Sequence, residues 1–215
     1  MTRTLSDHDY GRLDTLIKET ETSTNTQIVL AVIRRSDNYE ELPWKAFALG
    51  ASIAGLLILV LNLISNTWYQ QETTLFMVAG TLAGGFVFAL LTVLAPGFAK
   101  RFLSIHRAEV EVRQYAESLF LDRELFATSR RTGILLLVSL FERKIVILPD
   151  KGLNDRLTEK NMKSVIAEMT PFLKRRKIRE AFEAGLKQLS QFLAAEAPGS
   201  SENELPDQII EEKGI

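Results

Sequence analysis

The stretch "RTGILLLVSLFERKIVILPDKGL", from Arg131 to Leu153, predicts two short strands joined by a polar turn. Two strands alone are barely stable in water and need a third strand or a covering helix. The first strand is almost continuously apolar, which is typical of a strand covered on both faces. Since no further apolar, β-branched run of strand length follows this hairpin, an earlier part of the chain must complete its sheet.

We predict the missing strand at Gln27–Ile33, "QIVLAVI", which is rich in β-branched residues and bounded by polar ones. A helix is expected before it, because Ser6 and Asp9 have the spacing of a capping box. Apolar residues at helical spacing after Arg107 predict the helix that crosses over into the hairpin. The predicted fold class is α/β, a small mixed β-sheet flanked by helices.

Two further helices are predicted after the hairpin. The first covers Leu157–Met169, and the second begins at Pro171, a residue that is tolerated in the first turn of a helix. Beyond Ala197 the sequence is rich in Ser, Glu and Pro, a composition that favours disorder. The alternative for this tail is a short extended segment that adds to a sheet edge.

Two uncharged apolar segments, Ala46–Ile64 and Leu75–Ala95, interrupt this pattern. Each is about 20 residues long, the length that a helix needs to cross the hydrocarbon core of a membrane. They predict a transmembrane helical hairpin. Lys and Arg flank the pair and are missing from the loop at 65–74, so both ends of the chain are expected in the cytoplasm and the loop outside.

The predicted organisation is therefore one domain with a membrane insertion. The ends of a helical hairpin lie close together, so the two water-soluble parts can build a single sheet. The expected divisions are 1–43 and 97–197 for the two parts of the cytoplasmic domain, 44–96 for the hairpin, and 198–215 for an acidic, flexible tail.

The order of these elements resembles the TPM-domain family. The residues that carry the resemblance are "LSDHDYGRLDTLIKETETSTNTQIVLAVI", "RTGILLLVSLFERKIVILPDKGL" and "FLKRRKIREAFEAGLKQLSQFL". A membrane-bound bacterial branch is more similar still, with a hairpin of spans after "RRSDNYEELPWKAFALG" and a terminal "ENELPD". The resemblance implies the same α/β fold and location in a bacterial inner membrane. It also implies either an accessory role in the assembly or repair of membrane complexes, or a calcium-linked acid phosphatase activity.

By position, the resemblance places a calcium site after the second hairpin strand. Asp150, Asn154 and Asp155 could supply oxygen ligands to Ca²⁺, but the ion takes six to eight of them. A more distant residue such as Glu142 or Asp37 would have to contribute. The alternative is a turn at the strand end followed by a helix cap, which is a common use of Asp and Asn.

The sequence points to no catalytic residue. A phosphatase needs a nucleophile or a metal-bound water, together with cationic groups for the phosphoryl oxygens. A phosphate-binding glycine loop, a zinc-protease signature and a nucleophile elbow are all missing from the sequence. Cysteine is absent as well, which excludes thiol chemistry. We therefore expect a binding protein, with the phosphatase as the alternative.

Basic residues mark candidate contacts with anionic lipid. Charge is nearly balanced over the chain and no recognised nucleic-acid motif is present, so no nucleic-acid partner is expected. For the densest basic run, "KRRKIR" at Lys174–Arg179, the alternative is the solvated face of an amphipathic helix. The candidate lipid-contact residues are Lys100, Arg101, Lys174, Arg175, Arg176 and Lys177.

Small residues at spacings of four predict close helix packing within the spans. They serve either the contact of one span with the other, or a homo-oligomer or membrane-protein partner. The predicted packing residues are Ala46, Gly50, Ala54, Gly80 and Gly84.

Overall fold

The computed structural model describes residues 4–65, 71–194 and 209–214, and the side chains of 65 and 71–73 are not described. The helices are α1 (Asp7–Thr24), α2 (Glu41–Ser65), α3 (Gln71–Leu94), α4 (Pro96–Ala99), α5 (Ile105–Asp122), α6 (Glu159–Lys174) and α7 (Ile178–Leu193), with short 3₁₀ helices η1 (Lys100–Phe102), η2 (Leu125–Ala127) and η3 (Lys151–Leu153). The strands are β1 (Gln27–Arg35), β2 (Gly133–Ser139), β3 (Lys144–Pro149) and β4 (Ile209–Gly214). Two compact units result, one of residues 1–37 and 109–215 and one of residues 38–108.

The strands form a four-stranded mixed sheet in the order β3-β2-β1-β4. β1 and β2 pair in parallel from Gln27 with Gly133 to Ile33 with Ser139. β2 and β3 form the predicted antiparallel hairpin. The predicted α/β fold is therefore confirmed, and the strand at Gln27–Ile33 lies beside the hairpin as the sequence indicates.

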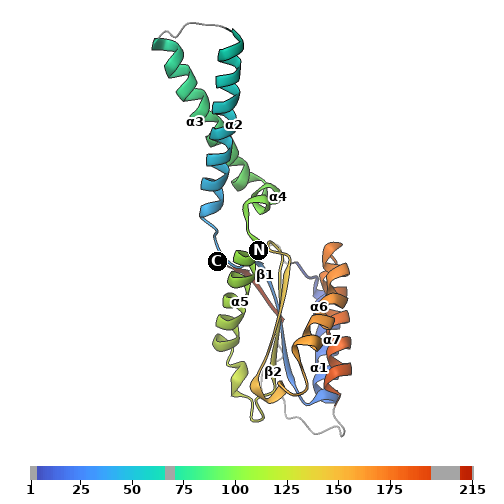
Figure 1. Ribbon diagram of the computed structural model, residues 1–215. Coiled ribbons are helices and arrows are strands. Elements are labelled where there is room, and N and C mark those ends of the chain that lie inside the picture. Colours follow the sequence, from blue (N-terminus) through green and yellow to red (C-terminus); the bar gives the residue numbers. More distant parts are fainter. Residues whose placement is uncertain (1–3, 66–70, 195–208, 215) are drawn as a thin grey trace. The chain divides into compact units, whose positions relative to one another are not determined.

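Helices cover both faces of this sheet, with α5 on one side and α1, α6 and α7 on the other (Figure 1). Alternate residues of β1 face opposite cores: Leu30 packs in the α1, α6 and α7 layer, and Ala31 packs in the α5 layer. Every residue of β2 is buried, which explains its unbroken apolar sequence. The predicted capping box is also confirmed, because Ser6 Oγ accepts from the backbone N–H of Asp9 and the Asp9 carboxylate accepts from the backbone N–H of Ser6.

The boundary between the last two helices differs from the prediction. Pro171 lies inside α6, near its end, and not in the first turn of the next helix. The helical conformation is interrupted only at Arg175–Lys177, where Arg176 has a left-handed backbone with φ +59°. Lys177 is the N-cap of α7 and Ile178 is buried behind it. The densest basic run, Lys174–Arg179, therefore extends from the end of α6 across the connection into the start of α7 and does not form the face of one helix.

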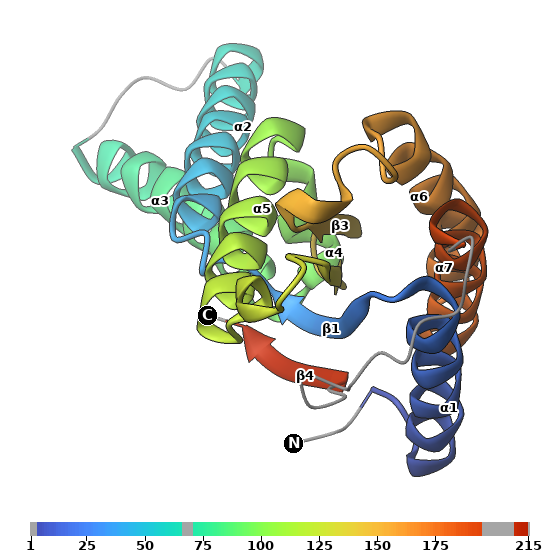
Figure 2. The same cartoon turned by 90° about the horizontal axis from the view of Figure 1, so that it is seen from below.

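Part of the tail is ordered as a strand, contrary to the flexible end that its composition favours. β4 pairs in parallel with β1, from Leu30 with Ile209 to Arg35 with Gly214 (Figure 2). Gly214 has φ +76°, and a Cβ there would lie 1.6 Å from the carbonyl oxygen of Arg35, so only glycine fits this end of the pairing. The "ENELPD" sequence lies outside the described residues.

The second unit contains α2 and α3, which pack against each other along their length (Figure 1). A Cβ on Gly84 would lie 2.5 Å from the Cβ of Ala54, and one on Gly50 would lie 2.7 Å from the carbonyl oxygen of Gly84. Ala46 is fully buried, and a Cβ on Gly80 would meet Ile58 at 3.0 Å. Gly50, Ala54, Gly80 and Gly84 therefore lie where the two helices approach each other.

Candidate functional site

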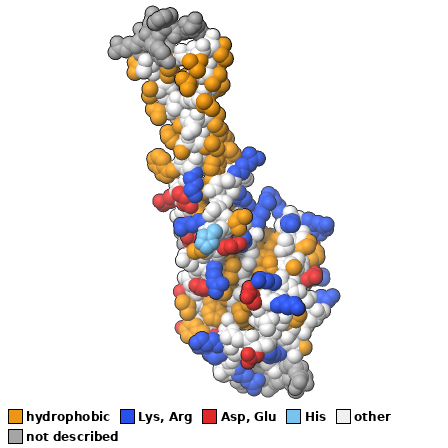
Figure 3. Space-filling view, viewed as in Figure 1, with side chains coloured by type: hydrophobic (Ala, Val, Ile, Leu, Met, Phe, Trp, Pro, Cys, Tyr) orange, Lys and Arg blue, Asp and Glu red, His pale blue; other side chains and the backbone are white. Residues whose placement is uncertain are grey.

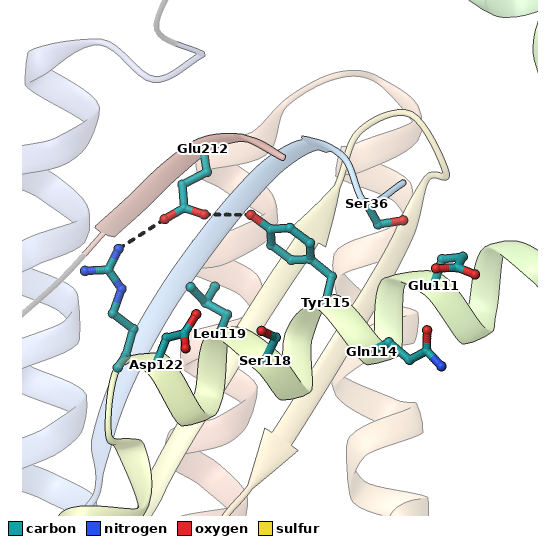
Figure 4. A pocket seen from close by; sticks show the side chains of 9 residues that line it. Ser36, Glu111, Gln114, Tyr115, Ser118, Leu119, Asp122 and Glu212 are labelled. Carbon is teal, nitrogen blue, oxygen red and sulfur yellow. Dashed lines mark hydrogen bonds and ion pairs between the residues drawn. The ribbon is translucent and has the colours of Figure 1, made fainter. Parts of the chain in front are cut away.

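A pocket of about 440 Å³ lies between α5 and β4 in the part of the chain that the structure describes (Figure 4). One wall is a single face of α5, because its lining residues recur at spacings of three and four. The other wall comes from the end of β1 and from β4. The polar and charged side chains that line it are Ser36, Glu111, Gln114, Tyr115, Ser118, Asp122, Arg123 and Glu212.

Glu212 joins the two walls of the pocket. Its Oε2 accepts a hydrogen bond of 2.6 Å from the hydroxyl of Tyr115, and its Oε1 pairs at 3.1 Å with the guanidinium of Arg123 (Figure 4). Burial of the phenol, and then its hydrogen bond to Glu212, raise the pKa of Tyr115 well above its ordinary value. Tyr115 therefore stays a neutral hydrogen-bond donor at physiological pH.

The raised pKa of Tyr115 predicts a specific loss at alkaline pH. The folded chain holds this proton more tightly than the unfolded chain, so its contribution to stability is complete below about pH 10 and is lost as the pH rises further. An absorbance titration of wild type minus Tyr115→Phe is expected to show a phenol that ionises well above pH 10. Glu212→Gln should move that titration back toward pH 10. A difference titration centred at pH 10 in the wild type would contradict the geometry.

The charges of the pocket favour a polar or cationic ligand group over an anion. Carboxylates of Glu111, Asp122 and Glu212 line it, against the one guanidinium of Arg123. Opposite charges attract and like charges repel most strongly where solvent is partly excluded. A phosphate ester would meet mainly repulsion here, so the pocket suits recognition of a polar partner group better than phosphoryl chemistry.

The residues of the predicted calcium site do not converge in the structure. Asp150 is buried and caps η3, with its Oδ1 accepting from the N–H of Lys151 and its Oδ2 lying 2.8 Å from Nε of Arg131. Asn154 and Asp155 are exposed. Among the described residues, no group of three or more His, Cys, Asp or Glu is arranged to hold a metal ion. The turn and cap account for Asp150, and calcium binding stays a prediction.

The ion pair at Asp150 makes a prediction of its own. Arg131→Gln removes the cation beside a buried carboxylate and is expected to lower the free energy of unfolding by about 1–3 kcal/mol. Arg130→Gln, on the exposed neighbour, is the matched control and should have little effect. Denaturation of the two variants in mild detergent measures the difference. Asp150→Asn should recover part of the loss in the double variant, and equal losses in Arg130→Gln and Arg131→Gln would contradict the assignment.

The more distant metal candidate, Glu142, also has another role. Its Oε1 accepts from the backbone N–H and the hydroxyl of Ser36, at 3.0 and 2.7 Å, and its Oε2 accepts from the hydroxyl of Ser139. These contacts tie together the carboxyl ends of β1 and β2. Nothing in the sequence indicates the contact between Ser36 and Glu142, since the two residues are far apart along the chain.

The candidate lipid-contact residues fall in two separate places. Lys100 and Arg101 belong to η1, in the unit of residues 38–108. Lys174 to Lys177 lie at the exposed connection between α6 and α7, in the sheet unit. Contact of either group with lipid stays a prediction.

The sequence does not indicate that Tyr115, Arg123 and Glu212 join the walls of the pocket. Tyr115 belongs to the helical spacing that predicts the crossover helix, and Glu212 lies in the tail whose composition favours disorder. The polar face of α5 has a regular spacing in the sequence, but the strand opposite it is predicted only as the alternative for the tail.

Residues 100–192 match the TPM domain family. The match begins at η1 and ends within α7, so it includes α5, the β2–β3 hairpin and α6 but neither β1 nor β4. Among solved structures, the chain is similar to the NMR structure of the BA42 protein from the psychrophilic bacterium Bizionia argentinensis, with a TM-score of 0.59 and 13% identity over 99% of this chain and 98% of that one. This likeness shows a shared fold. No curated protein matches the chain.

Proposed function

We propose that the chain is a membrane-anchored binding protein, an accessory factor in the assembly or maintenance of a membrane protein complex. The observation that carries the proposal is the exposed apolar surface of α2 and α3, which are inserted between β1 and α5. Both helices are long and apolar enough to cross a membrane, and only 6% and 11% of their most apolar windows are buried. A core helix of a water-soluble protein would be mostly buried. Figure 3 shows hydrophobic side chains along the visible face of the helical pair.

The orientation that we propose follows from the basic residues at the ends of the two helices. Arg34, Arg35 and Lys45 precede or open α2, whereas Lys100 and Arg101 follow α3. The sequence 65–74 between the spans contains neither Lys nor Arg. The positive-inside rule therefore favours a sheet unit on the cytoplasmic side of a bacterial inner membrane.

This topology predicts which positions a thiol reagent can reach from outside the cell. The chain contains no cysteine, so each introduced cysteine is the only one that can react. Single cysteines are introduced at Thr22 in α1, at Gln191 in α7 and at Asn66 between the spans. In intact spheroplasts a membrane-impermeant maleimide is expected to label Asn66→Cys alone, and the other two should react only after lysis. Labelling of Thr22→Cys and Gln191→Cys on opposite sides would overturn the single-domain topology.

The binding role rests on the α5–β4 pocket. A photo-crosslinking amino acid at Ser118 is expected to capture a membrane protein in native membranes. A chain that stops after Gln208 lacks the β4 wall and should lose that product. The same crosslinker at Lys160, an exposed residue of α6, serves as the control. Crosslinks that are equal at both positions, or that survive removal of β4, would count against the pocket as the binding site.

The second candidate is phosphatase activity, favoured by the name of the matching family, which pairs the TPM domain with the word phosphatase. The purified full chain in detergent would then hydrolyse a phosphate ester in the presence of Ca²⁺ or Mg²⁺. Asp150→Asn should abolish the activity while Arg130→Gln leaves it unchanged. Hydrolysis that is insensitive to both metal and Asp150 would point to a contaminant.

A further inference from the structure

Aromatic and basic side chains gather where the polypeptide enters α2 and where it leaves α3. We call residues 38–47 and 95–107 the collar. Within the unit of residues 38–108, α4 and η1 contact α2, and Arg107 lies 3.9 Å from Glu41 in the first turn of α2. The start of α2 and the segment that follows α3 therefore lie side by side in the collar.

Aromatic rings form the apolar part of the collar. The ring of Trp44 is 73% exposed and stands edge-on to that of Phe47, with 6.3 Å between centroids. Phe47 is itself held against α3, where a Cβ on Gly85 would meet its ring at 2.7 Å. The Phe98 ring packs edge-on against Phe88 of α3 and Phe102 of η1. Exposed Trp at the end of an apolar helix is typical of the membrane–water interface.

Basic side chains form the polar part. The collar contains Lys45, Lys100, Arg101 and Arg107 against two acidic residues, Glu40 and Glu41. Glu41 lies 3.9 Å from both Lys45 and Arg107, a separation at which exposed pairs are weak. By residue count the collar therefore carries an excess of positive charge, beside the exposed side chain of Trp44.

We infer that this collar binds the phosphate groups of anionic lipids and enriches them around the helical pair. The inference rests on the proposed membrane anchor and adds a lipid preference to it. Trp44 and Phe98 set the depth at which the helices sit, and Lys100 and Arg101 lie at the level of the headgroups. A basic residue near the surface of an anionic leaflet gains enough electrostatic energy to enrich such lipids about fivefold.

Trp44 can report this enrichment directly. The chain has two tryptophans, so Trp68→Phe leaves Trp44 as the only one. The full chain is reconstituted into vesicles made of equal parts of phosphatidylcholine and phosphatidylglycerol. In one set the phosphatidylcholine is brominated, and in the other set the phosphatidylglycerol is brominated. Quenching of Trp44 fluorescence then measures which lipid lies beside the collar.

Brominated phosphatidylglycerol is expected to quench Trp44 as though it were enriched about fivefold, and high salt should reduce the enrichment toward one. Lys100→Gln with Arg101→Gln should abolish it. Arg101→Lys, which keeps the charge, should retain it. The matched control is Lys160→Gln with Lys163→Gln in α6, which removes the same charge from the sheet unit and should change nothing.

The possible failures are distinguishable. Equal quenching by the two lipids overturns the lipid preference but supports the membrane anchor, and it leaves an acidic partner protein as the occupant of the collar. Enrichment that persists in the Lys100 and Arg101 double variant overturns the assignment to these residues. Trp44 that is quenched by neither lipid overturns the anchor itself.

Discussion

A chain that stops after Gln208 is expected to lose on the order of 4 kcal/mol of stability in its sheet unit. Ile210 is 7% exposed and packs in the α5 core, and burying such a side chain contributes about 1.5–3 kcal/mol. Glu211 accepts hydrogen bonds from the backbone N–H groups of Thr4 and Leu5, at 3.0 and 2.8 Å. Glu212 holds Tyr115 and Arg123. Each hydrogen bond adds about 0.5–1.5 kcal/mol.

The truncated chain should also self-associate, because removal of β4 exposes the edge of β1, an apolar strand. Pulse proteolysis of the full and truncated chains in mild detergent measures the loss of stability, and size-exclusion chromatography measures the association. Lys213→Ala is the control, since this exposed side chain of β4 contributes little burial. A truncated chain as stable and as monodisperse as Lys213→Ala would show that β4 does not hold the sheet.

Gly133→Ala is expected to destabilise the sheet unit by about 3 kcal/mol. Gly133 opens β2, and a Cβ there would lie 2.1 Å from the carbonyl oxygen of Leu125. The obstacle is backbone, which cannot rotate away as a side chain can. Either η2 must shift or the first pairing of β2 with β1 must break.

The same substitution at another glycine should have the opposite sign. Gly11 lies inside α1 with nothing within 4 Å of its Cβ position. Gly11→Ala is therefore expected to stabilise the chain by about 0.5–1 kcal/mol. Urea denaturation of both variants in the same detergent gives the comparison. Equal effects of the two substitutions would show that the contact with Leu125 is relieved at no cost.

The sequence predicts the centre of this fold well, because its signals there are local and redundant. β2 is apolar throughout and has a turn directly after it, so both its burial and its hairpin are evident. β1 is recognisable from its β-branched run, and the crossover helix α5 from its helical spacing. The two helices α2 and α3 are equally clear, since each contains an uncharged apolar segment of about 20 residues.

The edges of the fold depend on partners that are distant in sequence, and here the predictions were wrong or incomplete. β4 offers only Ile209 and Ile210 as apolar residues, and the rest of its stabilisation comes from α5 and the N-terminal segment. Pro171 is compatible with the first turn of a helix, and the sequence therefore predicts a helix start there. In the structure Pro171 lies in the last part of α6. Arg131 and Asp150 flank the hairpin at its two ends, and the pairing of β2 with β3 brings them together.

The position of β4 in the chain has a consequence for biosynthesis. β1 is made early, and the strand that covers its edge follows every other described element. Translation at about 5–20 residues per second separates the two by roughly 10 to 35 s. During that interval the edge of β1 that β4 will cover is unpaired, while neighbouring ribosomes synthesise further copies of the chain. A chaperone would keep neighbouring copies from pairing, and so would the proposed membrane insertion of α2 and α3, which would hold the nascent chains apart on the bilayer.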